Sequence, residues 1–136
     1  MLKDVYETVH EDIAIGNVTN ADFSGTTLCT VLFKGRSVYA ANAGDSRAIL
    51  ITTSKEVFQL TRDHKPDVPE EKARIKSYGG RVKPAANKLT GKNVGPVRVW
   101  LPLHDTPGLA MSRSIGDFMV HTAGVIAEPE ITEYKL

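Results

Sequence analysis

The sequence predicts an α+β fold in which antiparallel β-sheet is flanked by helices. Three observations support this: helical periodicity in residues 1–16, short β-rich runs between residues 25 and 60, and a second helix with marked ends near residues 67–80. The 136 residues, 41% hydrophobic and 24% charged, suit a single domain with a hydrophobic core.

Composition excludes several classes of partner. With 17 Lys and Arg against 16 Asp and Glu, the formal charge of +1 does not indicate binding to nucleic acid or to an anionic membrane. No apolar stretch is long enough to span a bilayer or to act as an export signal. The single cysteine, Cys29, lies in an apolar run and is expected to be a small buried residue. We therefore expect a reducing compartment, the cytoplasm or the nucleus.

The first predicted element is an amphipathic helix that ends near Gly16. Apolar residues recur at helical spacing and acidic residues fill the other face. The apolar positions are Leu2, Val5, Tyr6, Val9 and Ile13. The helix starts without an N-cap, so we expect the sequence to be part of a longer one. His10 lies beside the polar face and is expected to be solvated.

Four β-rich runs follow the helix and predict an antiparallel meander. They are Thr26 to Phe33, Ser37 to Asn42, Arg47 to Thr53 and Glu56 to Leu60. Several of these strands place apolar groups on both faces, so the sheet must be covered on both sides. The N-terminal helix covers one face, and we expect part of the other cover to be missing.

The turn between the second and third runs carries one acidic residue, Asp45. Gly44 tolerates positive φ, and Asn42 and Ser46 can form local hydrogen bonds, so a hairpin connection explains much of the pattern. A carboxylate at a strand end is also a suitable ligand for Mg²⁺ or Mn²⁺. Spacing alone leaves both interpretations open.

A short helix is predicted over Asp67 to Gly80. Asp67 is the expected N-cap with Glu70 as its capping-box partner, Pro69 lies in the first turn, and Gly79 ends the helix.

Arg81 to Pro107 is predicted to be a long irregular tract, of the kind that is usually functional or disordered. Within it, Trp100 is expected to anchor the tract to the body of the protein. Pro107 to Asp117 is predicted to be a turn or short helix, and Ile131 to Leu136 a strand that continues into a missing element.

The residues present exclude several common chemistries. The four histidines lack zinc-site spacing, and no nucleophile elbow, P-loop or dinucleotide fingerprint occurs. Oxygen-ligand metal chemistry remains, in which Mg²⁺ or Mn²⁺ generates a hydroxide nucleophile.

Seven short motifs follow one another along nearly the whole chain. They are Ser24-Gly25-Thr26-Thr27, Asn42-Ala43-Gly44-Asp45-Ser46-Arg47, Leu60-Thr61-Arg62-Asp63-His64-Lys65-Pro66, Glu71 to Ile75, Gly79-Gly80-Arg81-Val82, Leu109 to Asp117 and Gly124 to Ile131. In order and spacing, this series resembles the middle of the metal-dependent protein serine/threonine phosphatases of type 2C. The version over Gly95 to Asp117 looks most like plant and protist members.

This resemblance implies a fold and site roles. Residues 1–136 would form a single partial domain, part of the family's α/β/β/α sandwich, with residues 61–117 as a flap-like region. Asp45 would lie at a weaker, third metal position for Mg²⁺ or Mn²⁺, with Thr27 beside it. His64 and Arg113 would lie near the substrate or the scaffold. For Arg113 and Asp117 we expect a structural role, in which charge-assisted hydrogen bonds hold a loop to the sheet.

The sequence also departs from the family's pattern. It lacks the upstream acidic residue and D-G-H-G-G motif, and the downstream D-G-x-W-D and D-N motifs that complete the metal centre. The resemblance thus implies a parent enzyme that hydrolyses phosphoserine and phosphothreonine in proteins by metal-activated water, whereas this chain alone is expected to be inactive and to hold few metal ligands.

Two further expectations accompany that interpretation. The alternative function is a non-catalytic, phosphatase-like binding module. In either case, an incomplete sandwich exposes an apolar sheet face, so self-association is expected.

Overall fold

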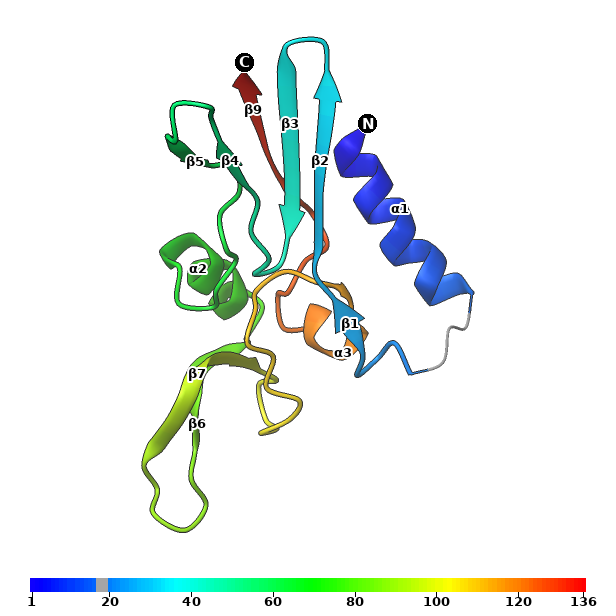
Figure 1. Ribbon diagram of the computed structural model, residues 1–136. Helices are drawn as coiled ribbons and strands as arrows, with labels where there is room; N and C mark the ends of the chain where they lie inside the picture. The colour runs from blue at the N-terminus through cyan, green and yellow to red at the C-terminus, as the bar shows by residue number, and fades with distance from the viewer. Residues whose placement is uncertain (17–19) are drawn as a thin grey trace.

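The computed structural model describes residues 1–16 and 20–136. In chain order the elements are α1 (Leu2–Ile15), β1 (Gly25–Thr26), β2 (Leu28–Lys34), β3 (Ser37–Ala43), β4 (Ile49–Ile51), β5 (Val57–Gln59), α2 (Pro69–Ser77), β6 (Arg81–Ala86), β7 (Asn93–Trp100), β8 (Ile115–Gly116), α3 (Phe118–His121) and β9 (Glu130–Lys135). This mixture of helices and antiparallel sheets is the predicted α+β class. Figure 1 shows the long strands β2, β3 and β9 together, with the β6–β7 hairpin extending away from them.

The central sheet has the strand order β2-β3-β9, and both of its pairings are antiparallel. On one face, Tyr6 of α1 packs with Ala41 and Ala43, and its hydroxyl donates a 2.7 Å hydrogen bond to the Ala41 carbonyl. These small side chains let the helix approach the sheet closely. The helix predicted for residues 2–16 is therefore confirmed, and it covers one sheet face as expected.

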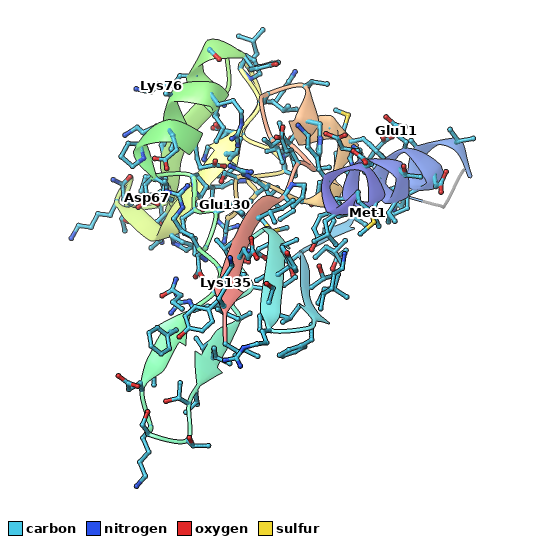
Figure 2. All side chains as sticks on the ribbon, turned by 90° about the horizontal axis from the view of Figure 1, so that it is seen from above. Met1, Glu11, Asp67, Lys76, Glu130 and Lys135 are labelled. Carbon is cyan, nitrogen blue, oxygen red and sulfur yellow. The ribbon has the colours of Figure 1, made fainter. Side chains whose placement is uncertain are left out.

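The other face of β3 packs on the segment that follows it. Val38 and Ala40 form a core cluster with Leu60, against which Ala48 and Leu50 also pack. Seen from above (Figure 2), α1, which contains Glu11, and α2, which contains Lys76, lie on opposite sides of β9. β3 is therefore buried on both faces, whereas parts of β2 and β9 are exposed.

The predicted four-strand meander is wrong, because its second and third strands, β3 and β4, do not pair with each other. β3 pairs with β9, from Ser37 opposite Lys135 to Asn42 opposite Glu130, so its second edge is occupied. β4 and β5 form a separate two-stranded sheet. The turn at Gly44 and Asp45 consequently leads the chain out of the sheet, and the hairpin interpretation of this turn is also wrong.

The helix predicted after residue 67 is confirmed as α2, but its start differs. Val68 is the N-cap, and no capping side-chain hydrogen bond occurs there among the described residues, so Asp67 is not the cap. Glu70 instead pairs with Arg62. At the other end, Gly79 adopts a φ of +81°, which supplies the left-handed residue that ends the helix.

The tract predicted to be irregular contains the antiparallel pair β6–β7, so that prediction is wrong. The register shifts after Pro84, and this irregularity accommodates Gly95 and Pro96 on the partner strand. Trp100 anchors the tract as predicted, because it is buried and its Nε1 donates to the Lys83 carbonyl at 2.8 Å.

A second core lies between α2, the base of this hairpin and the segment around α3. Its buried members are Ile75, Val99, Leu101, Val120, Ala123 and Val125. The predicted terminal strand is confirmed as β9. Cys29 on β2 is half-buried, and burial raises the pKa of its thiol. None of the helices in the described ranges is long and apolar enough to cross a membrane.

Candidate functional site

The turn that carries Asp45 is fixed by the segment that contains His64. The Gly44 amide donates to His64 Nδ1 at 3.2 Å, and the His64 amide donates to the Gly44 carbonyl at 2.9 Å. The Asn42 amide group donates to the Gly44 and Arg62 carbonyls, each at 3.0 Å. Two predicted motifs, residues 42–47 and 60–66, therefore form one hydrogen-bonded unit.

Thr27 also reaches this turn, from the start of β2. Its Oγ1 shares a 2.7 Å hydrogen bond with the Ser46 hydroxyl. Gly44 has a φ of +117°, and a Cβ there would lie 2.5 Å from Thr27 Cγ2, so the close packing requires glycine. The structure thus brings Thr27 to the turn that carries Asp45, the neighbourhood that the resemblance implies, and their role as metal ligands stays a prediction.

Asp45 does not lie within a complete metal site. Its carboxylate is partly exposed and pairs with the Lys65 ammonium group. Across residues 1–16 and 20–136, no three His, Cys, Asp or Glu side chains are grouped as metal ligands. Mg²⁺ and Mn²⁺ need several oxygen ligands, so the residues described here do not fit a metal centre by themselves.

His64 is fully buried and has a structural role in this arrangement. Because Nδ1 accepts from Gly44, the proton of the neutral ring lies on Nε2, which faces Glu130 Oε2 at 3.3 Å. Burial, and then the nearby charge of Arg113, lower the pKa of His64, so the ring is neutral at pH 7. Of the two alternatives left open for His64, the structure favours the scaffold.

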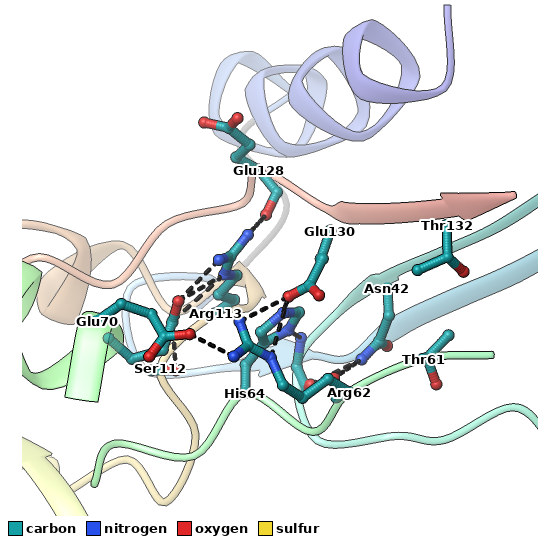
Figure 3. A network of polar contacts seen from close by, with 12 residues as sticks. Asn42, Thr61, Arg62, His64, Glu70, Ser112, Arg113, Glu128, Glu130 and Thr132 are labelled. Atoms are coloured by element: carbon teal, nitrogen blue, oxygen red, sulfur yellow. Dashed lines mark hydrogen bonds and ion pairs between the residues drawn. The ribbon is translucent and has the colours of Figure 1, made fainter. Parts of the chain in front are cut away.

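Around His64, charged side chains are paired in a network that Figure 3 shows. Arg62 donates to Glu130 at 2.9 Å and also pairs with Glu70. Nearby, Arg47 forms two 2.9 Å hydrogen bonds with Asp63 and so lowers the pKa of that carboxyl group. These pairs fix the extended segment over the end of the central sheet.

Arg113 is held by a buried carboxylate that the sequence analysis did not identify. Glu71 has no exposed surface, and its Oε1 accepts a 2.7 Å hydrogen bond from Arg113. Arg74 donates to both Glu71 oxygens, at 2.9 and 2.6 Å, and the Ser112 hydroxyl donates to Oε2 at 2.6 Å. Arg113 also reaches the Glu128 carbonyl at 2.9 Å (Figure 3). The expected structural role of Arg113 is thus observed, with a helix rather than the sheet as its main partner.

Asp117 has a structural position, but its buried carboxylate oxygen Oδ2 does not form the expected link to the sheet. Its Oδ2 is buried and has no hydrogen-bond partner in the part of the chain that the structure describes. The carboxyl group lies against Gly25, where an added Cβ would be 2.1 Å from Oδ2, and burial raises its pKa. The residue packs at the start of α3 instead of forming a charge-assisted link.

His10 is half-buried, whereas the sequence analysis expected it to be solvated. The ring stacks on His121 with centroids 4.3 Å apart, and its Nδ1 accepts from the Gly116 amide at 3.1 Å. His10 is covered because α3 packs against it, on the face of α1 that was predicted to be polar and exposed to solvent.

Comparisons with known proteins agree with this arrangement. The family model described as protein phosphatase 2C matches residues 2–136. "Probable protein phosphatase 2C 12" from Oryza sativa subsp. japonica is 48% identical over 118 residues, which cover 84% of this chain and 29% of that protein. "Probable protein phosphatase 2C 73" from Arabidopsis thaliana is 40% identical over 130 residues, which cover 93% of this chain and 34% of that protein. The chain spans about a third of the length of such curated relatives.

Solved structures show the same fold. The serine-threonine phosphatase 2C from Toxoplasma gondii superposes with a TM-score of 0.78 at 24% identity, over 98% of this chain and 45% of that one. A sex determining protein from C. elegans gives a TM-score of 0.77 at 23% identity, over 99% of this chain and 30% of that one.

Proposed function

The chain belongs to the protein phosphatase 2C family, and from that membership we propose that the protein in which it lies is a Mg²⁺- or Mn²⁺-dependent hydrolase acting on phosphoserine and phosphothreonine in proteins. The observation that carries this proposal is the family match over residues 2–136. The contacts among these motifs support it: the Thr27 and His64 motifs both reach the Asp45 turn, and the Ser112 amide, next to Arg113, donates to the His64 carbonyl at 2.9 Å. The alternative, a non-catalytic binding module, is not favoured, because the curated relatives bear phosphatase names.

Within that enzyme, we propose that these residues supply the frame and one edge of the metal centre. Asp45, with Thr27 beside it, would lie at an outer cation position, and the remaining ligands would come from outside residues 1–136. The partly exposed Asp45 carboxylate supports this, because a cation could reach it if the Lys65 ammonium group moved away.

The test is the exchange Asp45→Asn in the complete protein. We expect activity to need about tenfold more Mn²⁺, because an amide is a weaker ligand for a hard cation than a carboxylate. The matched control is Asp63→Asn, since Asp63 is bound by Arg47 and should leave the Mn²⁺ requirement unchanged. An identical Mn²⁺ requirement in the two variants would reject Asp45 as a ligand.

For residues 1–136 alone we also propose self-association. The support is apolar surface on β2, where the exposed fractions are 41% for Val31, 40% for Leu32 and 63% for Phe33. β2 is an edge strand of the central sheet, so its outer backbone groups are free to pair with a second strand.

A further inference from the structure

Positive charge is concentrated in one part of this nearly neutral chain. Residues 72–104 contain eight Lys and Arg and no Asp or Glu, which leaves nine basic and 16 acidic residues elsewhere. Five of the eight lie on the β6–β7 hairpin, at Arg81, Lys83, Lys88, Lys92 and Arg98. Figure 1 shows this hairpin extending away from the central sheet. The three lysines are exposed, whereas Arg81 and Arg98 are half-buried.

A groove runs along this hairpin. Its volume is about 320 Å³, and residues 84–86 are part of its lining. Lys83, Lys88, Trp100 and Asp105 line the remainder. The hairpin thus combines its charge with a concave surface large enough for a few side chains.

The base of the groove is held in place by hydrogen bonds to backbone carbonyls. Arg81 donates to Leu101 at 3.0 Å, Arg98 donates to Gly108 at 2.7 Å, and the Trp100 indole donates to Lys83. A preformed surface of this kind loses little conformational entropy when it binds a ligand.

One carboxylate already occupies part of this charged surface. Asp105 lies 2.9 Å from Arg81 and 3.3 Å from Lys83, and these two cations lower the pKa of its carboxyl group. Lys88 and Lys92, nearer the tip, are exposed and form no ion pair with any described residue. One carboxylate is therefore already bound at the base of the hairpin, and two lysines near its tip are available to bind carboxylates of another molecule.

We propose that the β6–β7 hairpin is a docking site for an acidic protein segment, whose carboxylates pair with Lys83, Lys88 and Lys92. Charge complementarity steers such a segment to the hairpin. Single-stranded nucleic acid is a poorer fit, because its bases need an exposed aromatic face and Trp100, the one aromatic residue in residues 81–100, is 8% exposed. This proposal does not depend on the phosphatase activity.

The test measures binding of a fluorescein-labelled peptide of alternating Glu and Ser to the full chain by fluorescence anisotropy. A Gln-Ser peptide, single-stranded DNA and phosphatidylserine vesicles are the comparison probes. The variant is Lys88→Glu with Lys92→Glu. The matched control is Lys34→Glu with Lys135→Glu, at two exposed lysines of the central sheet. Both variants change the formal net charge equally, because each contains two Lys→Glu exchanges.

We expect the acidic peptide to bind more tightly than the Gln-Ser peptide, DNA or vesicles. The hairpin variant should weaken binding about tenfold and the control by less than about twofold. Binding should disappear at about 0.5 M NaCl, which screens exposed charges. Equal weakening in the two variants, tighter binding of DNA or vesicles, or no binding of the acidic peptide would each overturn the proposal.

Discussion

At the scale of single residues, the buried carboxylate of Glu71 links three parts of the chain. It lies on α2, accepts hydrogen bonds from Arg74 on the same helix, and holds Ser112 and Arg113 of the later loop. Arg113 in turn reaches the backbone before β9. Glu71 is therefore one of the main links between α2 and the loop before α3, together with Arg74, which also donates to the Ser112 carbonyl at 2.8 Å.

The exchange Glu71→Gln should destabilise the protein by about 3 kcal/mol, because it leaves two guanidinium groups without a compensating charge in a buried site. The control is Glu70→Gln, one position earlier, whose solvent-exposed pairing with Arg62 should contribute little to the free energy of unfolding. Urea unfolding at pH 7 measures both, and equal losses would contradict the role given to Glu71.

The same carboxylate predicts a dependence of stability on pH. Burial alone would raise the pKa of Glu71, but the hydrogen bonds from Arg74, Arg113 and Ser112 outweigh it and lower the pKa from 4.5 to about 2. A lowered pKa means that the unfolded chain binds the proton first as pH falls. The stabilisation is therefore complete above pH 4.5 and is lost as pH falls towards about 2. The free energy of unfolding of the Glu71→Gln variant should therefore fall less than that of the native chain as pH decreases from 4.5 towards 2.

At the scale of elements, the contact between α1 and α3 contains two stacked imidazole rings. Burial, and then the charge of His10, lower the pKa of His121 to about 4, and burial lowers the pKa of His10. For a histidine whose pKa is lowered on folding, the stabilisation is complete above pH 6.5 and is lost as pH falls towards the folded pKa. This pH range lies above the one in which Glu71 acts.

We therefore predict that the native chain loses about 1–2 kcal/mol more stability between pH 7 and pH 5 than the variant His121→Phe, which keeps a ring but cannot be protonated. Unfolding curves at the two pH values test this, with an NMR titration of the imidazole protons as a second measurement. Parallel losses in the two proteins would show that the stacked pair does not control this pH response.

Elements defined by local pattern were predictable from the sequence, whereas those defined by distant pairing were not. The apolar spacing of α1 and the Gly79 stop of α2 lie within a few residues, so both helices were located. The pairing of β3 with β9 joins residues 37–42 to residues 130–135, which are far apart in the sequence, and leaves no local signal. Pro84, Gly95 and Pro96 concealed the β6–β7 hairpin, because they break the strand pattern at a register shift that only the structure reveals.

The candidate site divides in the same way. Family motifs placed Thr27 and Asp45 together, and they share one turn in the structure. Glu71 was missed because an acidic residue in a first helical turn already has an explanation in the helix dipole. A signal was present: Glu71 precedes Ile75 by four residues and so lies on the helix face that enters the core. Its cationic partner Arg113 comes from a distant loop that helix periodicity does not locate.

At the scale of the whole molecule, the central sheet is unevenly covered. Because β2 has exposed apolar side chains, we predict that residues 1–136 self-associate more as the protein concentration rises. The exchange Phe33→Lys should lower the average mass measured by light scattering, because it places a charge on the exposed edge strand. Leu89→Lys is the control, since Leu89 is even more exposed, at 96%, but lies on the β6–β7 hairpin. A monodisperse monomer of the unmodified chain at high concentration would contradict the prediction.

We propose that residues 1–136 form the frame of a family phosphatase whose metal centre is completed by residues outside this range. The most direct measurement is phosphate release from a phosphothreonine peptide with Mn²⁺, comparing residues 1–136 with the complete protein. We expect turnover by the complete protein and none by residues 1–136, because the described residues 1–16 and 20–136 contain no group of three His, Cys, Asp or Glu side chains placed to bind a metal ion. Turnover by residues 1–136 that survives repurification and is lost with Asp45→Ala would contradict it, as would a correctly folded complete protein that has no activity.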